Sequence, residues 1–174
     1  MKNLMTITFN LRSLLKTVIC LAFILGCATS TVLACTCIPP SKSFLEILSM
    51  ADFIIVGKVT NYHGLIPSQN APLAADIEIQ RVLKGNNTSE KVRVFGSDGL
   101  IAFCRQPTDK FPLNTNWVFA LNLLSTGANG EPQYYISSCG EYSLPVRAGK
   151  VFGRIKSDQQ TSMPLVKFLK SLPR

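Results

Sequence analysis

Histidine, tryptophan and acidic residues are scarce in this sequence. Its 174 residues include one His, one Trp and 10 Asp and Glu, against 18 Lys and Arg. A single histidine, His63, excludes the paired histidines of common zinc enzymes, and no glycine-rich phosphate loop is present. His63 falls in an unpatterned stretch, residues 61–73, with no nucleophile or carboxylate at a diagnostic spacing, so we interpret it as a solvated loop residue. The sequence therefore predicts a protein that is not an enzyme and has no cofactor of its own.

The start of the chain has the pattern of a secretory leader. Three basic residues and no acidic one occur in residues 1–16, and residues 17–26 are uncharged and mostly apolar. A membrane span needs about 20 apolar residues, roughly twice this run. A basic start, a short apolar run and a small residue before the cut are typical of a signal peptide. We predict that residues 1–34 are removed after Ala34 and that the protein is secreted, extracellular or periplasmic.

Two cysteines in or next to this leader leave a second route open. The residues before Cys27 and before Cys35 both loosely resemble bacterial lipoprotein cleavage boxes, in which the cysteine becomes acylated. Lipidation at either position would make the protein a cell-surface lipoprotein. Contact with a membrane is expected only in that case.

Four cysteines remain after the predicted cut: Cys35, Cys37, Cys104 and Cys139. An even number in an exported chain predicts disulfides, and four cysteines allow three pairings. Pairing Cys35 with Cys37 would close a very small ring in a segment stiffened by two prolines, which disulfide geometry disfavours. The other two pairings stay open. A four-cysteine zinc site is the rival, but it would favour two-residue spacings and a reducing compartment.

Basic residues exceed acidic ones moderately in residues 35–174, by 15 to 10. The resulting net charge of +5 favours binding to acidic surfaces. The basic residues are scattered rather than clustered, so we expect no nucleic-acid partner.

The pattern of residues 35–174 predicts one mainly β domain. Gly57 interrupts the first expected strand and predicts a bulge or bend. Ser43 and Glu46 have the spacing of a helix capping box. Five strands at turn-punctuated intervals with short flanking helices predict a small closed barrel. The expected helices are residues 43–48 and 165–172. The expected strands are residues 53–60, 76–83, 91–95, 117–124 and 133–138, with a last short strand formed by Val151, Phe152 and Ile155. Residues 61–73 and 96–115 are expected to be long loops.

The predicted mature N-terminus, residues 35–40 (CTCIPP), is the most distinctive segment. Two disulfides and two prolines would make it unusually rigid for a chain end. Rigidity before binding lowers the entropic cost of binding. The alternative is that the two cysteines only staple an end that would otherwise fray.

This start resembles the N-terminal inhibitory domain of the tissue inhibitors of metalloproteinases (TIMPs). The similarity extends over residues 35–145, through the segments FIIVGKV, DIEIQRVLKGN, KVRVF, WVFAL and QYYISSCG in the family's order. The resemblance implies an OB-type five-stranded barrel in which Cys35 pairs with Cys104 and Cys37 with Cys139. It also implies inhibition of metzincin-like zinc metalloendopeptidases.

The resemblance also implies how these residues would act. Cys35 would chelate the target protease's zinc through its free amine and its carbonyl oxygen, displacing the water that hydrolysis needs. Thr36 would enter the specificity pocket beside the metal. The remaining protease-binding residues would be Cys37, Ile38 and Pro39 along the cleft, and Ala102 and Phe103 against its other side.

The sequence departs from the TIMP pattern in two places. Leu45 and Ile47 occupy the region where the family's third N-domain disulfide begins, and the cysteine-rich C-terminal domain of vertebrate members is missing. A single-domain, bacterial-type relative fits best. The alternative function is a disulfide-stabilised OB-fold module that binds a ligand or the cell envelope without inhibiting a protease, since a fold does not transmit a function.

Overall fold

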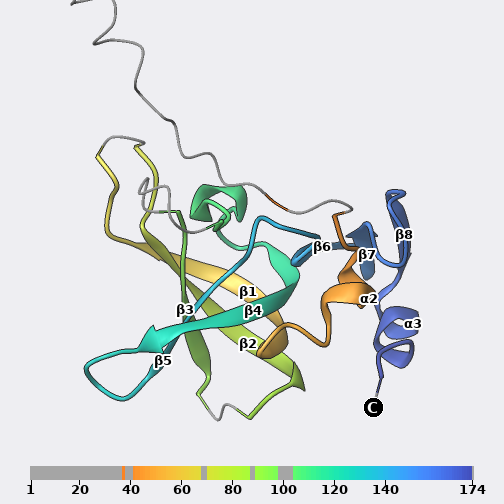
Figure 1. Ribbon diagram of the computed structural model, residues 1–174, viewed down its shortest axis with the longest axis horizontal. Coiled ribbons are helices and arrows are strands. Elements are labelled where there is room, and N and C mark those ends of the chain that lie inside the picture. Colours follow the sequence, from red (N-terminus) through yellow and green to blue (C-terminus); the bar gives the residue numbers. More distant parts are fainter. Residues whose placement is uncertain (1–36, 38–40, 68–69, 87–88, 98–103, 174) are drawn as a thin grey trace, which may run out of the picture. The chain divides into compact units, whose positions relative to one another are not determined.

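The computed structural model describes residues 37, 41–67, 70–86, 89–97 and 104–173. Five strands form a closed barrel, in the spatial order β1-β2-β3-β5-β4 with β4 pairing back to β1 (Figure 1). All neighbours are antiparallel except β3 and β5. This arrangement confirms the predicted five-stranded OB-fold-like barrel. The strands are β1 (Phe53–His63), β2 (Ala74–Lys84), β3 (Lys91–Phe95), β4 (Asn116–Thr126) and β5 (Pro132–Tyr135).

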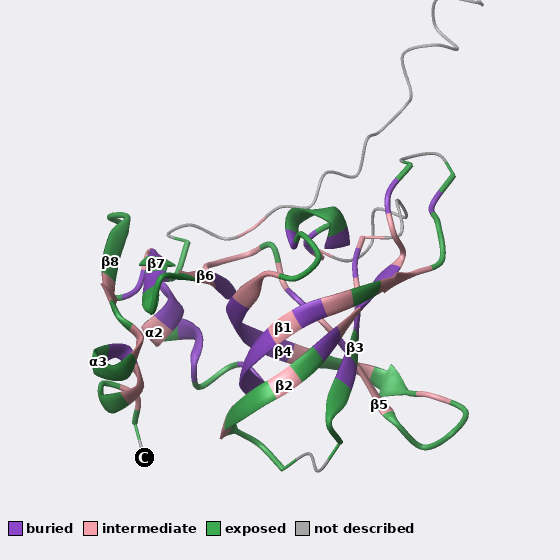
Figure 2. Cartoon of the chain, turned by 180° about the vertical axis from the view of Figure 1, so that it is seen from behind, coloured by how far each residue is buried: buried purple, intermediate pink, exposed green. Residues whose placement is uncertain are grey.

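Alternating apolar residues direct one face of β3 into the barrel. Val92 and Val94 are buried while Lys91 and Arg93 are exposed, which is the period of two that a half-buried strand requires. The β1 strand is different, because its first five residues are all buried (Figure 2). A strand that is covered on both faces has a continuous apolar run instead of alternation.

Gly57 lies at a break in the β1–β2 register, as predicted. The register shifts between Val56 and Gly57. A Cβ atom on residue 57 would come within 2.5 Å of the Ile77 Cγ2 atom and 2.9 Å of the Glu78 carbonyl oxygen. Only glycine permits this close approach of the two strands.

Three further strands extend the sheet beyond the barrel. β6 pairs with the first half of β4, β7 with β6, and β8 with β7. The sequence predicted only one strand here, from Val151, Phe152 and Ile155. That prediction missed β6 and β8. Ile155 lies outside the strands but is buried. The bounds are β6 (Ser143–Arg147), β7 (Lys150–Gly153) and β8 (Thr161–Pro164).

Two short helices flank the barrel domain, as predicted. They are α2 (Phe44–Ile47) and α3 (Leu165–Lys170). Phe44 and Phe168 are fully buried and meet edge to face, with ring centroids 5.7 Å apart. The pair therefore packs the first helix of the described chain against its last. Among the described residues, no helix is long and apolar enough to cross a bilayer.

The first predicted loop is shorter than expected, whereas the second, residues 96–115, has the predicted bounds between β3 and β4. β1 continues to His63 and β2 begins at Ala74, so the loop between them is 64–73 rather than 61–73. Residues 108–110 form a 3-10 turn, η1 (Thr108–Lys110), inside the predicted loop 96–115. Conversely, β5 ends at Tyr135 instead of residue 138.

Candidate functional site

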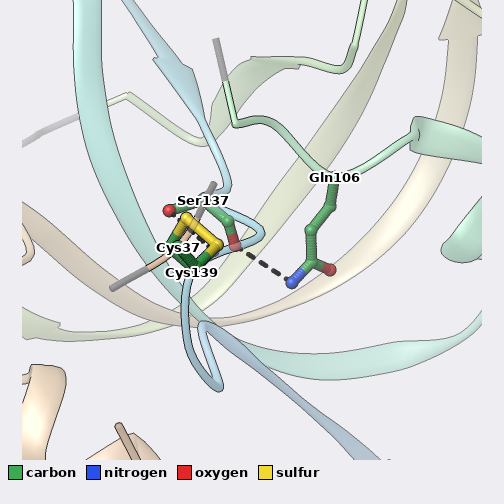
Figure 3. The surroundings of a disulfide bond; sticks show 4 residues. All are labelled: Cys37, Gln106, Ser137 and Cys139. Carbon is green, nitrogen blue, oxygen red and sulfur yellow. Dashed lines mark hydrogen bonds between the residues drawn. A yellow bond between two sulfur atoms is a disulfide. The ribbon is translucent and has the colours of Figure 1, made fainter. Parts of the chain in front are cut away.

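Three cysteine sulfurs gather beside one end of the barrel. Cys37 and Cys139 form a disulfide, with Cα atoms 5.2 Å apart and a separation of 102 positions in sequence (Figure 3). The Sγ atom of Cys104 lies within 4.8 Å of both sulfurs, and Cys104 is also disulfide-bonded. The Cys37–Cys139 pairing is confirmed, and it argues against the zinc alternative because bonded sulfurs are not thiolate ligands. Cys35, the predicted partner of Cys104, lies outside the described residues.

Backbone pairing explains why these sulfurs converge. The chain that follows Cys104 runs alongside the chain that follows β5, through an isolated bridge between Arg105 and Ser137. The Ser138 N–H donates to the Cys104 carbonyl at 2.7 Å, and the Gln106 N–H donates to the Ile136 carbonyl at 2.8 Å. These bonds hold Cys104 and Cys139 next to each other before any disulfide is considered.

Gln106 is the polar centre of this region. Its side chain is almost fully buried, and its Nε2 atom donates to the Ser137 carbonyl at 3.1 Å (Figure 3). Its Oε1 atom accepts from Lys110 Nζ at 2.8 Å and from Ser143 Oγ at 3.3 Å. Burial lowers the pKa of Lys110, and the charge of Glu141 acts in the opposite direction. One amide therefore joins η1, β6 and the segment after β5.

The chain just after residues 38–40 is fastened to the same region. Glu141 N–H donates to the Lys42 carbonyl at 3.0 Å. Arg154 donates to Ser41 Oγ and pairs with Glu141 at 3.0 Å, so Glu141 holds in place the guanidinium group that contacts residue 41. Cys37 is thus attached to Cys139, and Lys42 is attached to Glu141. The two partners, Cys139 and Glu141, lie two residues apart on the segment between β5 and β6. We call the described residues 37, 41 and 42 the anchored segment.

The first turn of α2 then fixes the direction in which the chain leaves the anchored segment. The Ser43 N–H donates to Glu46 Oε2 at 2.7 Å, which confirms the predicted capping box. The side-chain and backbone hydrogen bonds from Ser43 lower the pKa of Glu46. Phe44 N–H donates to the Arg154 carbonyl at 2.8 Å.

The structure describes only one of the predicted protease-binding residues. Cys37 is half-buried and bonded as expected. The other predicted site residues lie outside the described residues: Cys35, Thr36, Ile38, Pro39, Ala102 and Phe103. Sequence reasoning missed Gln106, Glu141 and Arg154, because none belongs to a motif and each acquires its role through pairing with distant chain segments.

The interpretation of His63 as a solvated loop residue was wrong. His63 is the last residue of β1, and its Nε2 atom lies 2.5 Å from Asp76 Oδ2. Arg93 Nε donates to Asp76 Oδ1 at 2.9 Å. Burial raises the pKa of Asp76, but hydrogen bonds and charges from Arg93 and His63 outweigh it, and the pKa lies below its usual value. We call these three residues the ionic cluster.

The ionic cluster arises from strand register. Asp76 lies opposite Asn61 on β1 and opposite Arg93 on β3. His63 is two residues beyond Asn61 on the same face of β1, which brings its ring diagonally over Asp76. The spacing of these residues along the sequence does not predict this contact.

A polar groove of about 480 Å³ lies between β3 and the turn that joins β4 to β5. It contains side chains of both charges, so neither polyanions nor polycations are strongly attracted to it. Asp76 and Arg93 of the ionic cluster form part of its wall. The other polar lining residues are Ser89, Glu90, Lys91, Asn129, Glu131 and Gln133.

No protein-family model and no curated protein matches this chain. The relationship to TIMPs therefore stays a prediction, based on the CTCIPP start and on the order of strands and cysteines.

Proposed function

We propose that this protein is a secreted inhibitor of zinc metalloendopeptidases that acts through the N-terminus created by cleavage after Ala34. The observation that carries the proposal is the Cys37–Cys139 disulfide with Cys104 Sγ within 4.8 Å of it. A chain end that enters a protease cleft resists cleavage and binds tightly only if it is held in shape. Covalent attachment two residues after the predicted terminus supplies that restraint.

The second support is the double attachment of the anchored segment. The disulfide holds one end of it, and the contacts of Ser41 and Lys42 with Glu141 and Arg154 hold the other. In sequence, residues 38 and 39, which would continue along the cleft, come between Cys37 and Ser41. The zinc in this proposal belongs to the protease, and the inhibitor contributes the amine and carbonyl of Cys35 as ligands.

The test begins with the natural N-terminus. N-terminal sequencing and intact mass should show Cys35 as an unmodified first residue, because acylation or a longer start would block its amine. That form should then inhibit members of a metalloendopeptidase panel. A version with one extra alanine before Cys35 should keep its melting temperature and lose inhibition. Equal inhibition by the extended version would show that the terminal amine is not a ligand.

Thr36→Gly separates side-chain recognition from folding. Inhibition should weaken by at least about tenfold, since a contact in the specificity pocket is removed. The matched control is Ser157→Gly, at an exposed position outside the anchored segment, which should leave inhibition unchanged. Parallel losses of inhibition and of thermal stability in Thr36→Gly would assign Thr36 a structural role instead.

The groove beside β3 favours a second function, an OB-fold binding module. OB barrels bind oligosaccharides and oligonucleotides on the face of their second and third strands. The lining here is polar and of mixed charge, which suits a neutral oligosaccharide better than a nucleic acid. If neither the parent nor the alanine-extended form inhibits any protease of the panel, this function takes precedence.

A further inference from the structure

The positive charge of the mature chain is concentrated at its C-terminal end. Residues 35–142, which include the barrel, contain eight Lys and Arg against nine Asp and Glu. Residues 143–174 contain seven Lys and Arg against one Asp. The even scatter expected from the sequence holds along the barrel but not along this last fifth of the chain.

The extension formed by β6, β7, β8 and α3 exposes most of these cations. Strand β7 alternates, with Val151 and Gly153 buried and Lys150 and Phe152 exposed. Arg147 is the cross-strand partner of Lys150, so both side chains leave the same face of the β6–β7 hairpin. Phe152 is 37% exposed on that face.

Helix α3 adds a second set of exposed side chains. Phe168 is fully buried, which directs Val166, Lys167 and Lys170 outward. Val166 is 65% exposed, the largest value among the exposed large apolar residues described.

Strand register and one hydrogen bond place the start of the helix next to the hairpin. Lys150 is the register partner of Pro164, and the Leu165 N–H donates to the Gly149 carbonyl at 2.8 Å. The first turn of α3 therefore begins beside the β6–β7 turn. Figures 1 and 2 show β7 and β8 next to each other, with α3 continuing from the end of β8. We define the basic patch as Arg147, Lys150, Phe152, Val166, Lys167 and Lys170.

We propose that the basic patch docks this protein on the surface of a bilayer that contains anionic phospholipid. Each Lys or Arg held near such a surface contributes attraction that is screened within a Debye length. Exposed apolar side chains among cations are the composition of interfacial membrane contacts. A soluble polyanion would attract the four cations equally well, but it would gain nothing from Phe152 and Val166. This docking is independent of the N-terminal site, and it would concentrate the protein at a membrane without any attached lipid.

The experiment is co-sedimentation of the purified protein with vesicles of phosphatidylcholine alone and of phosphatidylcholine mixed with phosphatidylglycerol. Binding is expected only to the mixed vesicles, and it should fall as salt is added. An acyl chain at Cys27 or Cys35 would bind both vesicle types alike, so the dependence on anionic lipid separates the patch from lipidation.

A matched pair of variants tests the location. Lys150→Glu/Lys167→Glu should reduce partitioning by about 30-fold or more, the effect of two cations near the surface. Arg81→Glu/Lys91→Glu changes the net charge equally on exposed barrel positions and should leave partitioning within about threefold of the parent. If the glutamate variant folds poorly, the milder change Lys150→Gln/Lys167→Gln replaces it, and it should also reduce partitioning to the mixed vesicles. Phe152→Ser/Val166→Ser should weaken binding to mixed vesicles and leave binding to dextran sulfate unchanged.

Three results would overturn the proposal. Equal losses in the patch and barrel variants would show that net charge alone is responsible. Binding to dextran sulfate with none to mixed vesicles would identify a soluble polyanion as the partner. Absence of binding to either would show that the basic patch is a solvated surface.

Discussion

The cysteine cluster (Cys37, Cys104 and Cys139) and the ionic cluster both join parts of the chain that are distant in sequence, but only the ionic cluster links strands of the barrel to one another. The disulfide joins residues that are 102 positions apart, and its sulfurs are half-buried. The ionic cluster joins neighbours in the sheet, with side chains 35% exposed for His63, 17% for Asp76 and 47% for Arg93. The disulfide holds Cys37 regardless of pH or salt, whereas the ionic cluster depends on both.

The largest expected effect is the loss of the disulfide. Cys37→Ser/Cys139→Ser should lower the free energy of unfolding by about 4–5 kcal/mol, because a loop of roughly 100 residues is no longer closed in the unfolded chain. Urea unfolding of the variant and parent under non-reducing conditions measures the difference. A loss below about 1 kcal/mol would show that the hydrogen bonds of Gln106 and Ser138 hold this region without the covalent bond.

A smaller effect is expected where the cysteine cluster relies on hydrogen bonds. Gln106→Leu leaves the buried Ser143 hydroxyl and the partly buried Ser137 carbonyl and Lys110 ammonium groups without their amide partner, and it should cost about 1–3 kcal/mol. The matched control is Gln133→Leu, whose hydrogen bond with Ser125 is exposed. That change should stay within about 0.5 kcal/mol of the parent in the same urea experiment. Similar values for both glutamines would contradict the central role of Gln106.

The smallest effect, and the one that depends on pH, belongs to the ionic cluster. Asp76→Asn should cost about 0.5–1 kcal/mol at neutral pH, because two of the three side chains are partly exposed. The pKa of Asp76 is lowered in the folded state, so its contribution is complete above the usual carboxyl range near 4 and is lost as the pH falls through the lower folded value. The variant should therefore show a flatter loss of stability in acid.

Urea unfolding at a series of pH values between about 5 and 2 measures this difference, with Asp158→Asn on the exposed surface as the control. Parallel curves for the parent and Asp76→Asn would show that the ion pairs contribute nothing measurable.

Local pattern was enough to predict the barrel. Alternation in residues 91–95 and the β-branched run after Phe53 identify their strands, since burial on one or both faces leaves a direct periodic signature. Gly57 could be assigned to a bulge because no other residue fits so close a strand. The capping box at Ser43 is equally local.

Contacts made by register or by distant pairing were not predictable in the same way. His63 reaches Asp76 only once β1 and β2 are aligned, and Gln106 is buried only once the chain after β5 lies beside it. The extension was underestimated because β6 and β8 are short strands whose exposed residues dilute the alternation. The predicted zinc-facing residues 35, 36, 38 and 39 stay a prediction that the inhibition experiments address.

The double attachment of the anchored segment has a consequence for the order in which the protein is made. Residues 37–45 leave the ribosome well before their partners at positions 139–141 and 154–155. At about 5–20 residues per second, this delay amounts to roughly 5–20 seconds of synthesis. Cys37 must stay unpaired, or exchange partners, throughout that interval. The Cys37–Cys139 disulfide therefore forms only after all five barrel strands have been made, and it depends on the thiol chemistry of the compartment into which they emerge.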